Sequence, residues 1–570
     1  MGKPKGLKVV APQKRKPEES NNGAALQKRR KREEAIKKAC EHGIEWLLEG
    51  NDLSAAKFRA EYFEKKPLHI QRPDRNFYNI FQELCTPEGL FGMLDSGEVA
   101  VSRLNMFRCI DGSNKEVPMP PPQSAADVRR LFSEGWSIQW LQPQQEHAIL
   151  ARFVATLESQ FGCLVGVNSY LTPPGTQGLA PHWDDVEVFV LQVAGSKAWQ
   201  LHTSSSVSNL PPESQTLPRY SSGDLPLASL SPVLMSPTLK AGDLLYFPRG
   251  TIHHAPNASR GEPSIHLTVS AFQRQTYFDL TNKAFEEVMS ELWENDESMR
   301  KTIPWTALGG ASKQYPELCS RVAALLRRSA DLIEEEAKAA AKGEADAGHV
   351  AGALADISSD FVQSRMPPLL RQPDQEVGSI ISPASYVQLL DPTALAIVPA
   401  PGDDEGSAAI VHCLQNSQQD HMMKRGASMP PGGVPGEGDD DEEEEEEEGD
   451  DDGDDEEEDN DEPALANDED DSDEAEEGWR VSAGSAAALR HLCNHSAQLP
   501  LSSGVKGTAA ISVREALEAA KVPQTSWVEV CGVLTQLAAL GLLVAQPSPP
   551  NGGTGAVKSA NAAPKAESAT

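Results

Sequence analysis

Short apolar runs, broken by proline and glycine, dominate the chain between residues 100 and 275. Five of them predict strands, some with an adjoining turn: 164–171, 187–193, 197–201, 241–248 and 264–270. Ala194-Gly195-Ser196 lies between the second and third runs and predicts the turn of a hairpin. In the last run His266, Thr268 and Ser270 alternate onto one face. Many short strands at this spacing predict an antiparallel sandwich or barrel.

The pattern changes to a helical period after residue 276. Apolar residues between 285 and 292, and again between 318 and 326, recur at three- and four-residue spacing. We therefore expect two or three helices in residues 276–375, with apolar faces that need cover from the β region or from a second subunit. A shorter run, Ile44–Leu48, predicts an entry helix near the start of the globular part at residue 37.

The last third of the chain divides around a polar block. Ala408–Leu414 predicts a strand before the block, and apolar periodicity returns at residue 478. Trp527–Leu543 predicts a final helix, and residues 547–570 form a Pro/Gly/Ala/Ser-rich tail that we expect to be disordered.

The net charge of −34 belongs mainly to that block. About 30 acidic residues lie between Glu437 and Glu477, without a single Lys or Arg among them. Such a run repels itself and cannot bury a core, so residues 425–477 are expected to be disordered. The rest of the chain is close to neutral, and the acidity is therefore not a property of the folded surface.

The N-terminal segment has the opposite charge. Lys14-Arg15-Lys16 and Lys28–Arg32 form two basic clusters, as in a bipartite nuclear import signal. We expect residues 1–36 to be a disordered basic arm with such a signal. An arm that touches nucleic acid without sequence preference is a compatible alternative.

Cysteine usage and hydropathy bear on the compartment. The eight cysteines form no CxxC pair, which argues against a zinc ribbon and a disulfide framework and fits a reduced compartment. No apolar stretch reaches the roughly 18 residues of a membrane span. A soluble intracellular protein without a membrane partner is expected.

His182 and Asp184 are the first candidates for chemistry. On an extended segment, residues two apart point to the same side, so both can reach one interior. An imidazole from a distant strand would complete the two-histidine, one-carboxylate set of non-haem Fe(II) oxygenases, and His253 can supply it. His254 is the rival for that place. His266 is either a core histidine or a residue that supports the metal ligands.

The JmjC-type ribosomal oxygenases are the family that these residues resemble. The nearest likeness is to the nucleolar type, described as bifunctional histidyl hydroxylases and lysine-specific demethylases. The resemblance runs from about Phe63 to Arg274 and is densest between Asn168 and Leu201. It rests on His182-Trp183-Asp184, Phe189–Gln192, Lys197, Tyr246–Gly250 and Ile252-His253.

The resemblance implies a chemistry for these residues. Residues 37–275 would form a double-stranded β-helix, the jelly roll of JmjC and cupin proteins, with Fe(II) bound by His182, Asp184 and His253 as the catalytic centre. The cosubstrate would be 2-oxoglutarate, whose far carboxylate needs a cation that Lys197 can provide. The remaining cosubstrate-lining positions would be Asn168, Tyr170, Thr268 and Ser270.

The resemblance also implies the parts that follow, which make the chain an α+β multidomain protein. Residues 276–375 would be a helical dimerisation region, so a homodimer is expected. A winged-helix-like domain would be split into residues 376–424 and 478–546 by the acidic insertion. A loop tolerates such an insertion because closure entropy grows only logarithmically with length. These segments lack an evident basic face, so the sequence does not establish direct nucleic-acid binding.

The expected protein is therefore a nuclear oxygenase, found in the nucleolus and nucleoplasm, that hydroxylates a histidine of a large-subunit ribosomal protein. A histone H3 lysine demethylase with the same iron chemistry is the first alternative. The second is a non-catalytic chaperone for histones or ribosomal proteins, in which the acidic tract is the active part. All of these partners are basic proteins that a long acidic tract attracts.

Overall fold

The structure, a computed structural model, describes residues 19–81, 86–112, 114–203, 217–230, 232–258, 261–272, 275–303, 315–342, 348–368, 380–399, 408–419, 421, 479–497, 510–540 and 542–546. The expected disordered insertion at 425–477 and the tail at 547–570 lie outside these residues, as does the first half of the basic arm. Among the described residues, no helix combines the length and the apolar character needed to cross a membrane.

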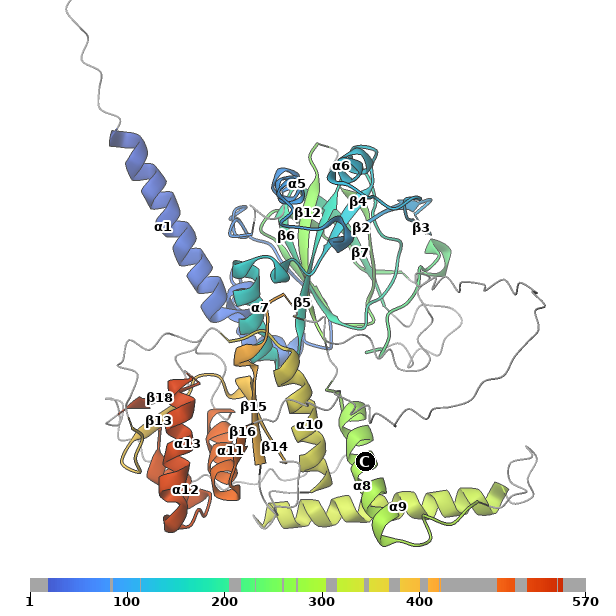
Figure 1. The fold of residues 1–570 in the computed structure, drawn as a ribbon. Coiled ribbons are helices and arrows are strands. Elements are labelled where there is room, and N and C mark those ends of the chain that lie inside the picture. Colours follow the sequence, from blue (N-terminus) through green and yellow to red (C-terminus); the bar gives the residue numbers. More distant parts are fainter. Residues whose placement is uncertain are drawn as a thin grey trace, which may run out of the picture.

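Two antiparallel sheets form the β domain, which lies above helices α8–α13 in the view of Figure 1. The larger has the order β1-β10-β6-β12-β5-β4-β2-β3, and the smaller has the order β11-β7-β8, with β9 also paired to β7. The strands of the larger sheet are β1 (Leu68–Ile70), β2 (Leu104–Ile110), β3 (Asn114–Glu116), β4 (Ser137–Leu141), β5 (Val165–Thr172), β6 (Glu187–Ala194), β10 (Leu244–Phe247) and β12 (Ser264–Ala271). Those of the smaller sheet are β7 (Ser196–His202), β8 (Val233–Met235), β9 (Thr238–Lys240) and β11 (Ile252–Ala258). The expected antiparallel sandwich of short strands is therefore present.

Alternation along the strands gives the larger sheet two different faces. Phe189 of β6 lies on the outer face, where its ring centroid is 5.8 Å from that of Phe58 and 5.7 Å from that of Phe161. Val188 and Val190, one residue away on either side, turn inward and pack with Trp199 of β7. The outer face is thus covered by helices, while the inner faces of the two sheets enclose a second, smaller core. The helices on this side are α2 (Ile44–Leu47), α3 (Ala55–Glu61), α5 (Pro87–Ser96), α6 (Ala125–Ser133) and α7 (Ala148–Phe161). The 3₁₀ turns of this domain are η1 (Val101–Arg103), η2 (Pro143–Gln145) and η5 (Leu227–Ser229).

The basic arm differs from its expectation. Residues Glu19–His42 form one long helix, α1, that projects from the body of the protein (Figure 1). Its sequence is rich in Ala, Gln, Lys, Arg and Glu, which are strong helix formers. At its inner end Ala39 and Cys40 are buried, and Thr156 of α7 hydrogen-bonds the Cys40 carbonyl at 2.5 Å. The expectation of disorder is therefore wrong for residues 19–36, because propensity and this anchoring contact favour the helix.

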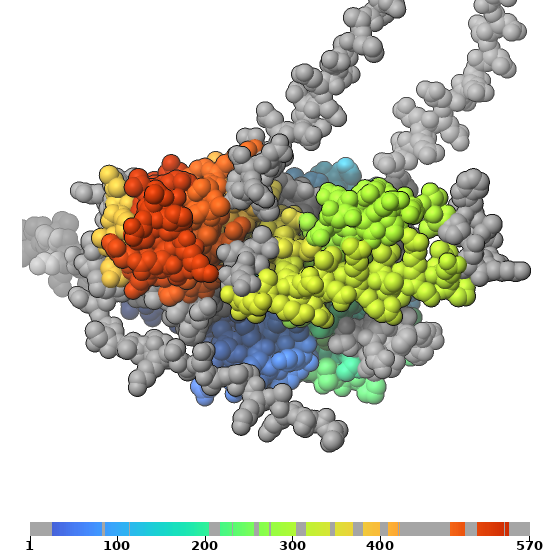
Figure 2. Space-filling model, turned by 90° about the horizontal axis from the view of Figure 1, so that it is seen from below, coloured from blue at the N-terminus to red at the C-terminus, as the bar shows by residue number. Residues whose placement is uncertain are grey.

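Three helices occupy the region where helical spacing predicted two or three: α8 (Tyr277–Asn295), α9 (Tyr315–Ala341) and α10 (His349–Ser364). A capping box between Thr276 and Asp279 starts α8. Figure 2 shows these helices, coloured green to yellow, open on the lower face of the molecule beside the red C-terminal helices. Val322 and Leu326 of α9 remain 55% and 52% exposed. Part of the apolar surface of this region is thus uncovered within one chain.

The C-terminal unit combines chain segments from both sides of the acidic block. Its elements are β13 (Tyr386–Leu389), η7 (Pro392–Ala394), β14 (Leu395–Pro399), β15 (Ala408–His412), η8 (Cys413–Gln415), β16 (Trp479–Val481), α11 (Ala483–Ala497), β17 (Ile511–Ser512), α12 (Val513–Ala519), η9 (Gln524–Ser526), α13 (Trp527–Ala539) and β18 (Leu543–Gln546). β15 pairs with β16, with Ile410 opposite Trp479, and both segments contribute to one core. The expected final helix ends at Ala539 rather than Leu543, because Leu543–Gln546 instead pairs with β13.

A buried polar network joins this unit to the barrel. Glu158 of α7 is fully buried and accepts hydrogen bonds from the backbone N–H of Val165 (3.1 Å) and of Met366 (2.7 Å). Nε2 of the equally buried His421 lies 2.9 Å from the same carboxylate. Helix α7 is therefore one of the elements that connect the two units, together with η2, whose Gln145 donates to the His421 carbonyl.

Candidate metal centre

The backbone brings two of the proposed ligands face to face. His182 and Asp184 lie on an extended segment just before β6, and His253 is the second residue of β11. His182 N–H donates to the His253 carbonyl (3.2 Å), and His253 N–H donates to the His182 carbonyl (2.8 Å). This isolated bridge is the single strand-like pairing of the segment. It fixes the separation of the two imidazoles without a regular strand at residues 182–184.

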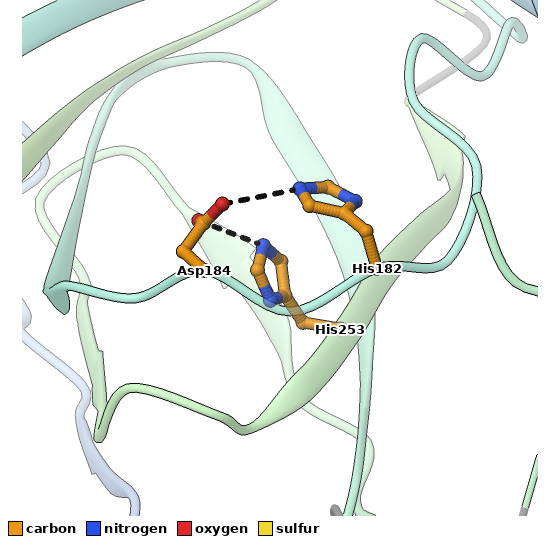
Figure 3. Close-up of side chains that lie close together, drawn as sticks. All are labelled: His182, Asp184 and His253. Atoms are coloured by element: carbon orange, nitrogen blue, oxygen red, sulfur yellow. Dashed lines mark ion pairs between the residues drawn. The ribbon is translucent and has the colours of Figure 1, made fainter. Parts of the chain in front are cut away.

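The three side chains converge on one point (Figure 3). One ligand atom from each of His182, Asp184 and His253 lies within 4.8 Å of the other two. Asp184 approaches His182 Nε2 at 3.8 Å through one oxygen and His253 Nε2 at 3.6 Å through the other. Among the described residues this is the one cluster of at least three such groups with ligand spacing.

Hydrogen bonds fix which ring nitrogen faces the centre. His182 Nδ1 lies 2.8 Å from the Ala180 carbonyl, and His253 Nδ1 lies 3.0 Å from the Thr251 carbonyl. Because a carbonyl only accepts, Nδ1 of each ring is the donor in these contacts, and Nε2 is the nitrogen that faces the shared point. Burial, and then the charge of His182, lower the pKa of His253 to about 4, so this imidazole is neutral at physiological pH. Two imidazoles and one carboxylate fit a divalent iron ion and leave coordination positions open.

The three side chains of the site differ in exposure. The His253 side chain is 7% exposed, but His182 and Asp184 are 17% and 31% exposed. A substrate group can therefore approach from the side of His182 and Asp184. The opposite side is closed by Trp199, Leu201 and Phe247 of the inner core.

The rival ligand His254 points elsewhere. Alternation along β11 turns it away from His253, and its ring stacks on His202 of β7 at 5.7 Å between centroids. His254 is buried, and neither of its ring nitrogens has a hydrogen-bond partner in the part of the chain that the structure describes. The structure therefore brings His253, and not His254, to the triad.

Lys197 lies inside the barrel as a buried amine. Its Nζ donates to Thr172 Oγ1 at 3.1 Å, and no described carboxylate pairs with it. Burial alone lowers the pKa of this amine to about 7. An amine in this setting gains most from an anion that would restore its charge, which fits the carboxylate of a bound diacid.

The other predicted pocket residues form one wall of the same interior. Adjacent strands β5 and β12 place Asn168 opposite Thr268, and Ser270 follows two residues further along. Tyr170 Oη accepts a hydrogen bond from Gln139 Nε2 (2.8 Å), and Asn168 Oδ1 accepts one from the Gln142 backbone (3.2 Å). Burial and then the charge of Asp184 raise the pKa of Tyr170, so its hydroxyl stays protonated. The wall is polar, whereas the facing wall is apolar.

Thr172 is the residue of this wall that the sequence reasoning missed. It follows Asn168 and Tyr170 at the same two-residue interval, so it shares their face of β5. That alternation was the available signal. Thr172 matters because, among the described residues, it is the one hydrogen-bond partner of the Lys197 amine.

Comparisons with known proteins agree with this geometry. A family model described as the JmjC domain matches residues 139–280, which include all three triad residues. The fold and the site together define a JmjC-type barrel with a two-histidine, one-carboxylate centre.

The similarity extends beyond that domain. Ribosomal oxygenase 2 of Rattus norvegicus is 32% identical over 381 residues, which cover 64% of this chain and 76% of the relative. The chain belongs to the ribosomal oxygenase family. Ribosomal oxygenase 1 of Gallus gallus is 32% identical over 359 residues, or 62% of this chain and 56% of that protein.

A third relative carries a two-part name. It is the bifunctional lysine-specific demethylase and histidyl-hydroxylase NO66 of Drosophila mojavensis, 30% identical over 59% of this chain and 36% of its own length. Among solved structures, the Escherichia coli ribosomal oxygenase YcfD in complex with cobalt and 2-oxoglutarate aligns with 87% of this chain and 99% of its own, at 14% identity and a TM-score of 0.39.

Proposed function

We propose that this protein is an Fe(II)- and 2-oxoglutarate-dependent oxygenase that hydroxylates a histidine side chain of a large-subunit ribosomal protein. One observation carries the proposal. A triad of two imidazoles and a carboxylate shares an interior with a buried amine that no described carboxylate neutralises. A metal with open positions and an anionic cosubstrate are the two groups that this interior would satisfy.

Each group has residues suited to hold it. His182, Asp184 and His253 would bind the iron, and Lys197 with Thr172 would receive the far carboxylate of 2-oxoglutarate. Its 2-oxo acid end would then lie toward the metal, along the wall formed by Asn168, Tyr170, Thr268 and Ser270. When bound, iron and 2-oxoglutarate supply the oxidation, in which O₂ is divided between succinate, formed with loss of carbon dioxide, and the hydroxylated substrate.

The protein supplies orientation and shelter for that chemistry. The carbonyls of Ala180 and Thr251 hold the imidazoles in one tautomer. The apolar wall of Trp199, Leu201 and Phe247 limits water on the closed side of the centre. The substrate side chain enters from the open side, beside Asp184.

Demethylation of methyl-lysine on histone H3 is the second candidate. It is favoured by the two-part name of the Drosophila relative. The chemistry is shared, because hydroxylation of an N-methyl group gives a hemiaminal that loses formaldehyde. Both candidate substrates are basic proteins.

The test is succinate formation from 2-oxoglutarate with Fe(II) and either a histidine-containing ribosomal-protein peptide or a methylated histone H3 peptide. His182→Ala should abolish turnover, whereas His254→Gln, at the histidine outside the triad, should retain it. Mass spectrometry separates the candidates, since a gain of one oxygen on histidine differs from loss of methyl groups from lysine. Turnover that is equal in wild type and His182→Ala would refute the enzyme and leave an acidic-tract chaperone as the function.

The helical region is proposed to form a homodimer. Trp293, Val322 and Leu326 are each more than half exposed on α8 and α9, and their burial against a second copy would be favourable. Sedimentation at micromolar concentration should give twice the monomer mass. The mass of a monomer under these conditions would refute the proposed homodimer.

The C-terminal unit is proposed to be a winged-helix-like domain, with helices α11–α13 packed against β13, β17 and β18.

Nuclear and nucleolar localisation is proposed from the two basic clusters. Lys28, Arg29, Arg30 and Lys31 are exposed on the projecting part of α1, where an import receptor can reach them. Imaging of a fluorescent fusion, with these four residues changed to Gln, tests the signal; unchanged nuclear accumulation would count against it.

A further inference from the structure

A third histidine lies inside the barrel without a role in the triad. His266 of β12 is 2% exposed, and its ring lies flat against Tyr170, with centroids 4.9 Å apart and planes 5° from parallel. Trp199 meets the same ring edge-on at 5.4 Å and 82°. The two aromatic residues therefore fix the plane of the imidazole.

One polar atom of this ring lacks a partner in the part of the chain that the structure describes. His266 Nδ1 is buried and has no hydrogen-bond partner among the described residues. Buried polar atoms are nearly always paired, because an unpaired one loses its hydration without compensation. In a barrel that binds a small anion, an unpaired nitrogen on the polar wall marks a contact made by the ligand.

The position of the ring places it near Lys197. Along β12, Ser264 lies opposite Thr172, which binds Lys197, and His266 is the next inward-facing residue, opposite Tyr170. Trp199 provides a common reference, since its ring centroid is 5.4 Å from that of His266, 5.7 Å from Lys197 Nζ and 6.1 Å from the His253 ring. His266 and Lys197 thus flank the same side chain.

The protonation state of His266 allows its imidazole to donate or accept a hydrogen bond but not to act as a second cation beside Lys197. Burial, and then the neighbouring charges of Lys197 and His253, lower the pKa of His266 well below its ordinary value. The ring is neutral and carries a single N–H. Its preference for the neutral form also means that it does not compete with Lys197 for the anion's charge.

We infer that His266 is a cosubstrate-binding and specificity residue, whose imidazole hydrogen-bonds the far carboxylate of 2-oxoglutarate beside Lys197. The inference rests on the proposed function. In this arrangement the diacid is selected over 2-oxo acids with an apolar tail, since only a carboxylate satisfies both Lys197 and His266. The stack on Tyr170 holds the imidazole in place before the cosubstrate arrives.

The test is an anaerobic titration of the Fe(II)-loaded full-length protein with a 2-oxo acid. Binding is monitored through the visible charge-transfer absorption that a chelating 2-oxo acid gives with Fe(II). Two ligands are compared: 2-oxoglutarate, and 2-oxopentanoate, which has a methyl group in place of the far carboxylate. His266→Phe keeps a ring against Tyr170 but has no N–H, whereas His266→Gln keeps a donor and loses the ring.

His266→Phe should bind 2-oxoglutarate about 10- to 100-fold more weakly, the usual effect of one hydrogen bond to a charged group. Its affinity for 2-oxopentanoate should equal that of the wild type. His266→Gln should recover part of the preference for the diacid. If the Phe variant does not fold, His266→Leu serves as the variant without a donor.

Two outcomes would overturn the inference. Unchanged 2-oxoglutarate affinity in His266→Phe or His266→Leu would show that the imidazole only packs. Equal weakening of both ligands would place its effect at the metal end or in the fold. A wild-type protein that binds Fe(II) but shows no charge-transfer band with 2-oxoglutarate would instead refute the proposed function itself, so the two failures are distinguishable.

Discussion

At the scale of single residues, the interior of the barrel holds buried ionisable groups whose pKa values are shifted toward the neutral form. His253 and His266 are kept uncharged by burial, and Lys197 has a pKa of about 7. Each of these buried polar groups lowers the stability of the protein when its ligands are absent. Each would be stabilised once a cation occupies the triad and an anion occupies the pocket.

For Lys197 this loss of stability can be measured through its dependence on pH. Its pKa is 10.5 in an unfolded chain and about 7 in the fold, so unfolding takes up a proton between those values. The ligand-free fold therefore loses stability from this group as the pH falls from about 10 to 7, and no further below 7. At pH 8 the buried neutral amine lowers the free energy of unfolding by roughly 3 kcal/mol.

Lys197→Met should raise the free energy of unfolding of the empty protein by about that amount, as measured with urea, and should abolish stabilisation by 2-oxoglutarate. A variant less stable than the wild type would contradict the pKa assignment.

The same amine predicts a pH dependence of cosubstrate binding. At pH 8 the free amine is mostly neutral, and a bound carboxylate favours the ammonium form. Binding of 2-oxoglutarate should therefore take up close to one proton, and affinity should fall by up to tenfold per pH unit above about 7. Calorimetry in buffers of different ionisation enthalpy measures this uptake. Binding without proton exchange would mean that Lys197 is already charged in the empty site.

At the scale of elements, helix α7 connects the barrel to the C-terminal unit. The buried carboxylate of Glu158 receives three donors: the backbone N–H groups of Val165 and Met366, and the imidazole of His421. Removal of a buried carboxylate leaves such donors without a partner. Glu158 therefore links α7 to β5, to the segment after α10 and to the segment after η8.

Glu158→Ala is expected to destabilise the protein by about 3–5 kcal/mol. The loss should appear as a lower urea midpoint, with Glu61→Ala on the exposed surface of α3 as the matched control within about 0.5 kcal/mol of wild type. A Glu158→Ala variant as stable as the control would show that the network is not needed for docking.

The limits of prediction from sequence follow from the range of the forces involved. His182, Asp184, His253 and Lys197 could be found because ligand chemistry restricts both residue type and spacing. The strand at 187–193 could be found as a continuous apolar run, because both of its faces are buried, and the strand at 264–270 could be found by its alternation. Helix α1 was missed because a basic run resembles a disordered arm, while its packing on α7 is a long-range contact. The strand at Leu543–Gln546 was missed for the same kind of reason, since its partner β13 lies more than a hundred residues earlier.

At the scale of the whole molecule, charge is separated along the chain. The folded parts are close to neutral overall, whereas 437–477 carries about 30 acidic residues. Such a tract attracts basic proteins over distances set by the Debye length, about 8 Å at physiological salt. Its expected contribution is to substrate capture and not to the chemical step.

Deletion of 437–477 should weaken capture of a whole basic substrate protein at low salt and spare turnover of a short peptide. The measurement is the apparent KM for both substrates across a series of salt concentrations. In the deletion variant the salt dependence should be flatter for the protein substrate. An identical salt dependence with and without the tract would exclude recruitment by charge.

The most direct test of the central claim follows the two atoms of O₂. Turnover of the Fe(II)-loaded protein with 2-oxoglutarate and a ribosomal-protein peptide under heavy-oxygen-labelled O₂ should place one labelled atom in succinate and one in the hydroxylated histidine. His182→Ala should give neither. Unlabelled peptide from the wild-type protein, with or without succinate formation, would contradict the account of this barrel as a histidyl hydroxylase.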